Sequence, residues 1–192
     1  PTKSSAASDV YKRQVLMNKK MRIALLTDHV PLKNVSLLIS KELIEKKVKI
    51  LYRSLKLDFK IKTPKLAILG MNPHASDNGI IGEEEQKIII PTINKLNQIG
   101  LNIKGPFSAD GFFGQKNYLN FDGVLSCYHD QGLVGFKALS FGNGINYTAG
   151  LSSVRTSPDH GTAFDIAGKN IANQSSFLKA VKSACQIWNN KK

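Results

Sequence analysis

The order of apolar and polar residues along the chain predicts strands that alternate with helices. Four short apolar runs have the length of buried strands, at residues 21–27, 65–71, 121–128 and 144–150. Three longer segments carry apolar residues at helical spacing, 35–55, 83–100 and 175–188, and a shorter helix is expected around residues 131–138. This alternation is typical of a layered α/β fold, so we expect that class.

Signals at the ends of these segments refine the prediction. The acids Glu83–Glu85 fall in the first turn of the second long helix, where they complement the helix dipole. Pro91 predicts a kink within that helix, and Gly100 predicts its C-terminal cap. Either Ser175 or Ser176 is the expected N-cap of the last helix.

The first fourteen residues, PTKSSAASDVYKRQ, differ in character from the rest of the chain. They are mostly small and polar, show no hydrophobic period, and resemble translated adapter or vector sequence. We therefore expect residues 1–14 to be a disordered, non-native leader. Residues 15–192 are expected to form the folded part, as one core or two small lobes that share one.

Composition limits the class of protein. Hydrophobic residues make up 42% of the 192 residues, which argues against disorder throughout. No apolar run approaches the roughly 20 residues of a membrane span, and no signal-peptide pattern is visible. Cys127 and Cys185 lie far apart without CxxC spacing. We therefore expect reduced thiols, a cytoplasmic location and no membrane partner.

The net charge of +13 has two explanations. An anionic partner, either a nucleic acid or a phosphorylated substrate, would favour basic residues. A proteome that uses Lys as its usual surface residue would give the same charge. Because the lysines are scattered and no nucleic-acid-binding motif accompanies them, we expect no nucleic acid partner.

All four histidines fall in stretches expected to be loops, and three come directly after expected strands: His29, His74 and His129. If these strands are neighbours in an open α/β sheet, the three side chains converge outside the carboxyl ends of the strands, where such sheets bind ligands. Three neutral imidazoles would then suit a divalent metal with open positions for water or substrate. A histidine after a strand is equally an ordinary loop or capping residue. The spacing matches no local metal motif such as HExxH, so both interpretations stay open.

The segment DHGTAFDIAGKNIAN, residues 159–173, also has two interpretations. Gly161 and Gly168 permit close backbone approach, and His160 and Asp165 offer hydrogen bonds, as a nucleotide site requires. The same residues suit a polar turn before the last helix. No G-x-G-x-x-G fingerprint follows a strand, so a nicotinamide cofactor would not be held in the Rossmann manner.

Three further polar residues lie on successive expected elements: Lys137, Asn146 and Arg155. Lys and Arg could hold a phosphate or a carboxylate, and Arg can do so through two parallel hydrogen bonds. Taken singly, each cation is also typical of a solvated surface.

Together these stretches resemble the 4-hydroxythreonine-4-phosphate dehydrogenase family of pyridoxal phosphate biosynthesis. The resemblance covers about residues 15–190 and rests on RIALLTDHVPL, LGMNPHASDNGIIGEEE, IKGPFSAD, YHDQGLVGFK, GINYTAGL and RTSPDHGTAFDIAGKNIAN. The last segment also resembles the adenosine-binding loop of isopropylmalate and isocitrate dehydrogenases, whose layered α/β fold the family shares. The resemblance therefore implies that fold, incomplete here because the family's N-terminal part has no match.

The resemblance also implies a role for each matching residue. The implied ligands of zinc, cobalt or magnesium are His29, His74 and His129. The implied substrate-binding residues are Lys137, Asn146 and Arg155. The NAD adenosine would lie against Asp159, His160, Gly161, Thr162, Asp165 and Asn173. The implied catalytic residues are His129, Asp130 and Lys137, with Asp130 orienting the metal site or, like Lys137, serving as general base.

The implied enzyme is a homodimer with its active site at the interface. It oxidises 4-phosphohydroxy-L-threonine with NAD and decarboxylates the product to 3-amino-2-oxopropyl phosphate. The metal would lower the pKa of the substrate's secondary hydroxyl and stabilise the enolate as carbon dioxide leaves. The cofactor carries the hydride chemistry, and the protein positions it.

The chain departs from the family because a glycine-rich N-terminal segment and a phosphate-binding His-Thr pair have no match. We therefore expect the chain alone to be inactive. One alternative is a sister enzyme that acts on a four-carbon sugar-acid phosphate (threonate or erythronate 4-phosphate) or a related hydroxy acid. Another is a non-catalytic metal- or nucleic-acid-binding module, which would bind DNA or RNA with a steep salt dependence.

Overall fold

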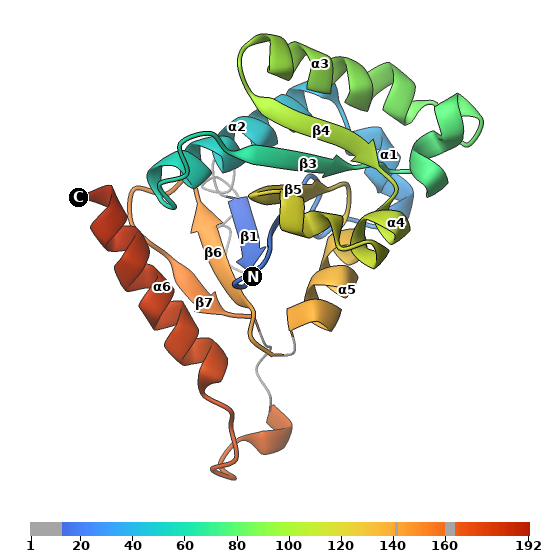
Figure 1. Ribbon diagram of the computed structural model, residues 1–192. Helices are drawn as coiled ribbons and strands as arrows, with labels where there is room; N and C mark the ends of the chain where they lie inside the picture. Colours follow the sequence, from blue (N-terminus) through green and yellow to red (C-terminus); the bar gives the residue numbers. More distant parts are fainter. Residues whose placement is uncertain (1–12, 141, 160–163) are drawn as a thin grey trace.

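A seven-stranded mixed sheet runs through the computed structural model, which describes residues 13–140, 142–159 and 164–192 (Figure 1). Its strands are β1 (Arg13–Met17), β2 (Arg22–Leu25), β3 (Lys65–Leu69), β4 (Asn102–Phe107), β5 (Gly123–Ser126), β6 (Ile145–Ala149) and β7 (Thr156–Pro158). Their order across the sheet is β4-β3-β5-β2-β1-β6-β7. This architecture is the layered α/β class that the sequence predicts.

Four neighbouring strands of the sheet, β4, β3, β5 and β2, run parallel to one another. Val124 of β5 pairs with Ile23 of β2 on one side and with Ala67 of β3 on the other. The carboxyl ends of β2, β5 and β3 therefore lie side by side at one edge. The expectation that the three strands before His29, His74 and His129 are neighbours is confirmed.

The helices of the described ranges fall into two groups. The α-helices are α1 (Val35–Leu38), α2 (Lys41–Leu57), α3 (Ile90–Gln98), α4 (Ala109–Gly114), α5 (His129–Ser140) and α6 (Ser175–Lys191). The 3-10 and π-helical segments are η2 (Leu32–Asn34), η3 (Pro73–Gly79), η4 (Glu85–Ile89), η5 (Asn117–Asn120) and η6 (Phe164–Ile166). None of the helices in the described part of the chain is both long and apolar enough to cross a membrane.

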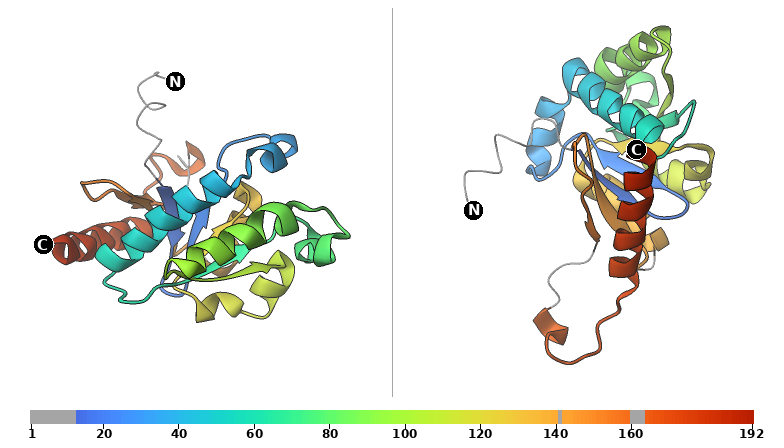
Figure 2. Two further views of the ribbon diagram at one scale, coloured as in Figure 1. Left: turned by 90° about the horizontal axis from the view of Figure 1, so that it is seen from above. Right: turned by 90° about the vertical axis from the view of Figure 1, so that its left-hand side faces the viewer.

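The helices cover both faces of the sheet, because successive strand residues point to opposite sides. Leu66 and Ile68 of β3 belong to the larger core, which they share with α2, α3 and α6. Ala67 and Leu69 belong to a smaller core with α4 and with Phe136 of α5. Figure 2 shows α2 and α3 crossing the same side of the sheet, with α6 along its β7 edge.

Two expected helices are interrupted in the structure. The segment 35–55 breaks after α1, and α2 starts afresh with Ser40, whose side chain accepts a hydrogen bond from the Leu43 N–H. The segment 83–100 opens with the π-helical turn η4 directly before Pro91, which is where a proline disturbs helical hydrogen bonding. Gly100 follows the last turn with a φ of +90°, as its predicted capping role requires.

The last helix does not begin as the sequence predicts. Its N-cap is Gln174 rather than Ser175 or Ser176, and the Asn173 side chain accepts a hydrogen bond from the Ser175 N–H at 2.8 Å. The Ser176 hydroxyl instead donates to the Gly144 carbonyl at 2.7 Å, which ties α6 to the sheet.

Three strands were not among the expected elements: β1, β4 and β7. β1 begins at Arg13, so the last two residues of the segment set apart as a leader lie in the sheet, while residues 1–12 lie outside the described ranges. β4 contains Gly105 and Pro106, which usually mark turns. A Cβ at Gly105 would collide with the Ile68 carbonyl, so glycine permits β4 to approach β3.

Candidate functional site

The three histidines that follow strands all lie at the carboxyl edge of the parallel part of the sheet. His29 lies in the loop after β2, and His129 is the first residue of α5, directly after β5. His74 lies in η3, after β3. This is the edge at which open α/β sheets bind ligands.

Two of these histidines lie next to each other. The ring centroids of His29 and His129 are 5.6 Å apart, and the rings are tilted by 43°. They line a pocket of about 380 Å³ whose other lining residues are Asp28, Val30, Leu32, Val35, Tyr128 and Asp130. The pocket thus combines two imidazoles and two carboxylates with an apolar wall.

The orientation of His129 suits a metal ligand. Its Nδ1 lies 2.7 Å from the Asp130 Oδ1. Because a carboxylate accepts hydrogen bonds, Nδ1 carries the proton, and the lone pair is then on Nε2. A carboxylate that holds the far nitrogen of a metal-binding imidazole is a recurrent arrangement in metal sites. The Asp130 carboxylate therefore holds the His129 ring in one orientation.

His74 lies on an unusual backbone. Residues 74–78 all have positive φ, from +44° to +70°, although none is glycine. A left-handed turn of this kind is unfavourable for L-residues and persists only where surrounding contacts hold it. Within the described ranges, no three His, Cys, Asp or Glu side chains are grouped as a metal site. One chain therefore brings His29 and His129 together and does not add His74 to them.

Glu85 holds the start of the left-handed turn, and the sequence analysis did not single it out. It is fully buried. Its carboxylate accepts hydrogen bonds from the backbone N–H groups of Met71 and Asn72, at 2.6 and 2.8 Å, and from the Asn72 side chain at 2.8 Å. The three consecutive acids of GEEE gave no local sign of this, because the partners lie on another segment.

Asp110 is a second acid that the sequence analysis missed. Hydrogen bonds from the Ser108 hydroxyl and the Gly111 backbone, together with the charge of nearby His74, hold the pKa of Asp110 below its ordinary value. Asp110 therefore stays ionised beside His74. The available signal was its place in IKGPFSAD, one of the stretches that carry the family resemblance.

Cys127 is buried just after β5 and is not suited to be a nucleophile. Burial, with a smaller contribution from the charge of Glu85, raises the pKa of its thiol far above the ordinary value. Its Sγ donates to the Leu69 carbonyl at 3.3 Å. A thiol that stays protonated is inert, so Cys127 is a structural residue.

The expected substrate residues share one side of the sheet. Asn146 of β6 pairs directly with Leu16, which packs in the smaller core beside Phe136 of α5. The Arg155 guanidinium donates to the Thr148 hydroxyl at 3.4 Å, and Thr148 is on the same face of β6 as Asn146. Lys137 is exposed on α5. All three expected residues thus lie on the α5 side of the sheet.

The expected NAD segment is described only in part. His160, Gly161 and Thr162 lie outside the described residues, and Asp165 is in η6. A Cβ at Gly144 would collide with the Asp159 carboxylate, so Asp159 packs directly over that glycine. Asn173 uses its side chain to cap α6.

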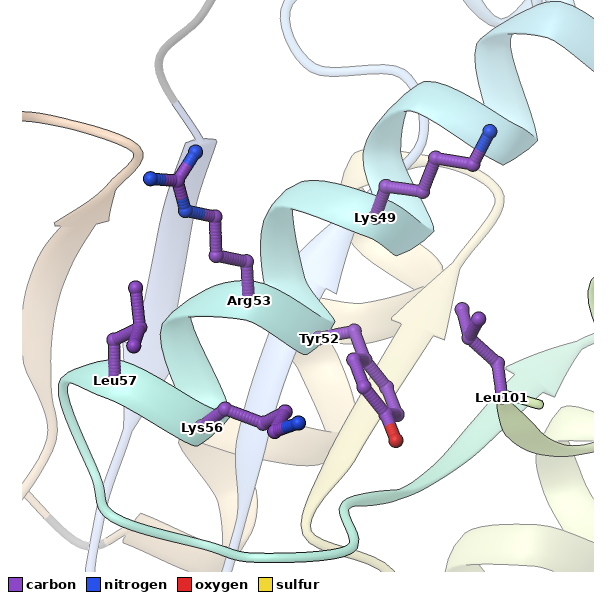
Figure 3. Close-up of a pocket in the computed structure, with 6 residues that line it drawn as sticks. All are labelled: Lys49, Tyr52, Arg53, Lys56, Leu57 and Leu101. Atoms are coloured by element: carbon purple, nitrogen blue, oxygen red, sulfur yellow. The ribbon is translucent and has the colours of Figure 1, made fainter. Parts of the chain in front are cut away.

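A second, larger pocket has no such chemistry. It has a volume of about 410 Å³ and lies on the outer face of α2, where it is lined by Lys49, Tyr52, Arg53, Lys56, Leu57 and Leu101. Figure 3 shows the Tyr52 ring turned toward Leu101, while the charged ends of Lys49 and Arg53 point away from them. The cations do not converge on one point, so we assign no site there.

Comparisons with known proteins assign the chain to a family. The family described as pyridoxal phosphate biosynthetic protein PdxA matches residues 5–184. A 4-hydroxythreonine-4-phosphate dehydrogenase of Bacteroides thetaiotaomicron is 50% identical over 92% of this chain and 49% of its own length. A Sulfurihydrogenibium enzyme of the same name is 52% identical over 88% of this chain and 52% of its own length. The chain thus spans about half the length of the curated relatives it matches.

Solved structures give the same result for the fold. A 4-hydroxythreonine-4-phosphate dehydrogenase from Klebsiella pneumoniae superposes with a TM-score of 0.81 at 34% identity, over 94% of this chain and 54% of the other. A terephthalate 1,2-cis-dihydrodiol dehydrogenase from Burkholderia xenovorans has a TM-score of 0.73 at 26% identity, over 92% of this chain and 56% of the other. The same half-fold therefore occurs in dehydrogenases with different substrates.

Proposed function

Because this chain belongs to the family of pyridoxal phosphate biosynthetic protein PdxA, we propose that it supplies the metal- and substrate-binding half of a 4-hydroxythreonine-4-phosphate dehydrogenase. The proposed reaction is the NAD-dependent oxidation of 4-phosphohydroxy-L-threonine, with decarboxylation to 3-amino-2-oxopropyl phosphate. The observation that carries the proposal is the His29–His129 pair at the carboxyl edge of the parallel strands.

The residues of this pair fit a divalent metal. Two imidazoles lie within reach of a shared ion, and Asp130 keeps the His129 lone pair on Nε2. Such donors accept zinc, cobalt and other divalent ions, and open positions remain for water or substrate. When bound, the metal would lower the pKa of the substrate's secondary hydroxyl.

A second subunit is the proposed source of the third histidine. His74 does not join the pair within one chain, and apolar side chains near both histidine segments face solvent. Leu37 is 82% exposed and Ile80 is 81% exposed, and Leu32 lies at the mouth of the histidine pocket. Exposed apolar residues around a polar site are typical of a subunit interface. We infer a homodimer in which His74 of one chain completes the site of the other.

The polar groups on the α5 side would hold the substrate. Lys137 and Arg155 carry the positive charges that a phosphate or carboxylate needs, and Asn146 adds an amide on the same side of the sheet. Lys137 and Asp130 are the candidate general bases, since both belong to the helix that begins at His129. Asp159–Asn173 is the proposed NAD segment, which its sequence supports.

A sister activity is the second candidate, favoured by the structural likeness to a dehydrogenase with a different named substrate. Such an enzyme would keep the histidines and the NAD segment and oxidise threonate or erythronate 4-phosphate. The choice depends on the groups around Lys137, Asn146 and Arg155.

An assay of NADH formation separates these functions. The chain would be purified with and without the half of the Bacteroides thetaiotaomicron enzyme that lies outside the match, and supplied with Zn²⁺ or Co²⁺. We expect turnover of 4-phosphohydroxy-L-threonine only with the added half, because the relatives are about twice as long. A preference for erythronate 4-phosphate would select the sister activity. Full turnover after Lys137→Ala would contradict the substrate assignment, with the exposed Lys182→Ala variant as control.

A further inference from the structure

We propose that Gln131 is a positioning residue that fixes the His74 turn relative to His129, an inference that rests on the proposed function. Its Oε1 accepts a hydrogen bond from the Cys127 N–H at 2.7 Å. Its Nε2 donates to the Gly70 carbonyl at 2.6 Å. One side chain thus connects the residue at the end of β5 to the residue at the end of β3.

The connection lies where the sheet itself stops joining the two strands. Ile68 and Leu125 form the last registered pair between β3 and β5, and Gly70 and Cys127 lie just beyond it. A carboxamide offers one acceptor and a donor group, as a peptide group does, so it can continue the hydrogen bonding between diverging strands. Its orientation is fixed because a backbone N–H only donates and a carbonyl only accepts.

Gly70, which Gln131 holds, is itself in contact with the left-handed turn. A Cβ at Gly70 would lie 2.9 Å from the Cα of Ala75, so the turn packs against this glycine. The next two N–H groups, of Met71 and Asn72, are held by Glu85. Glu85 fixes the turn to its own segment, whereas Gln131 comes from the helix that begins with His129. In a twofold dimer, a shift of the turn would alter both metal sites by symmetry.

Asn97 is a matched control, because its side chain makes the same kind of hydrogen bonds as Gln131 in another part of the sheet. Asn97 also makes two backbone hydrogen bonds through its carboxamide, accepting from the Ile103 N–H and donating to the Ile103 carbonyl, both at 2.9 Å. It joins the end of α3 to β4, and its hydrogen bonds are part-buried like those of Gln131. Loss of either amide removes two hydrogen bonds of the same kind.

The first measurement uses the metal-free full chain. Hydrogen exchange of the backbone amides of Cys127 and of residues 71–79, except Pro73, would be compared in the parent, Gln131→Leu and Asn97→Leu. We expect faster exchange in both places for Gln131→Leu and parental rates for Asn97→Leu. Gln131→Glu keeps the acceptor for Cys127 but sets an oxygen against the Gly70 carbonyl. It should accelerate exchange in 71–79 more than at Cys127, and it replaces the leucine variant should that fail to fold.

The second measurement uses metal. Zn²⁺ affinity by competition calorimetry and the visible spectrum of bound Co²⁺ report ligand geometry without any turnover. We expect Gln131→Leu to weaken Zn²⁺ binding by at least about tenfold, as loss of a group supporting metal ligands does, and to change the Co²⁺ spectrum. Asn97→Leu should do neither. Parental affinity, spectrum and exchange in Gln131→Leu would overturn the positioning role. A parent chain that binds no metal would overturn the proposed function, while exchange would still decide whether Gln131 joins the two segments.

Discussion

The segments that carry His129 and His74 follow neighbouring parallel strands, yet the first is a right-handed helix and the second has a left-handed backbone. His129 opens α5, a right-handed helix of 12 residues. His74 lies in a turn in which five consecutive non-glycine residues have positive φ. The helix follows from local preferences, because it needs only its own hydrogen bonds and an apolar face. The left-handed turn opposes local preferences and depends on Glu85, Gly70 and Gln131.

The difference between the helix and the left-handed turn indicates where the backbone is retained for function rather than for local stability. Strained, non-glycine backbone is retained mainly where surrounding contacts over-determine it, and such places are often functional. The His74 turn has a buried carboxylate and a bridging amide to hold it, and it presents a histidine. The outer face of α2 has a larger pocket but regular backbone and diverging cations. The support around the turn, rather than pocket size, distinguishes the His74 segment from the outer face of α2.

The largest expected effect is a loss of metal binding, and it tests whether His129 and His74 of one metal site come from different subunits. His129→Ala and His74→Ala should each lose stoichiometric metal binding in the proposed homodimer, because each removes one of the three proposed ligands. A mixture of the two variants should recover about a quarter of the parental metal, since half the random dimers are mixed and each has one intact site. Atomic absorption after co-refolding measures this. No recovery in the mixture would mean that all three ligands come from one chain.

The next effect tests what holds the left-handed turn. Glu85→Ala leaves the part-buried N–H groups of Met71 and Asn72 without their acceptor, which should lower the free energy of unfolding by roughly 3 kcal/mol. Glu84 accepts from the Asn72 side chain, at 2.9 Å, whereas the Met71 and Asn72 N–H groups both donate to Glu85, so Glu84→Ala should cost less than about 1 kcal/mol. Urea denaturation of both variants gives the values. Equal losses would show that the turn does not depend on the buried carboxylate.

The smallest expected effect is a change in stability on glycine substitution, which should have opposite signs in the His74 turn and in α5. Ala75 has a φ of +51°, so Ala75→Gly should relieve backbone strain. We expect the free energy of unfolding to rise by at most about 1 kcal/mol. Ala138 is exposed within α5, so Ala138→Gly should cost about 1 kcal/mol. Both shifts are measurable by urea denaturation. A loss of stability in Ala75→Gly as large as that in Ala138→Gly would argue against a strained turn.

Much of the fold is readable from local pattern. The apolar runs gave β2, β3, β5 and β6, and helical spacing gave most of α2, α3, α5 and α6, because hydrophobic period is a local property. β7 was missed because it has only three residues, and β4 because it contains the turn-forming Gly105 and Pro106. β1 was missed because its first two residues fall in the segment that was set apart as a leader. The predicted N-cap of α6 was wrong because four polar residues in a row, Asn173 to Ser176, can each serve as the cap.

By itself the sequence determined that strands alternate with helices, that three histidines follow strands, and that the stretches around them resemble one enzyme family. Only the tertiary structure decided which strands are neighbours, that His29 and His129 meet while His74 does not join them, and that the turn at His74 is left-handed. The physical reason is separation along the chain. Glu85 acts on Met71 from 14 residues away, and Gln131 acts on Gly70 from 61 residues away. Local preference cannot encode a conformation that exists only because distant segments hold it.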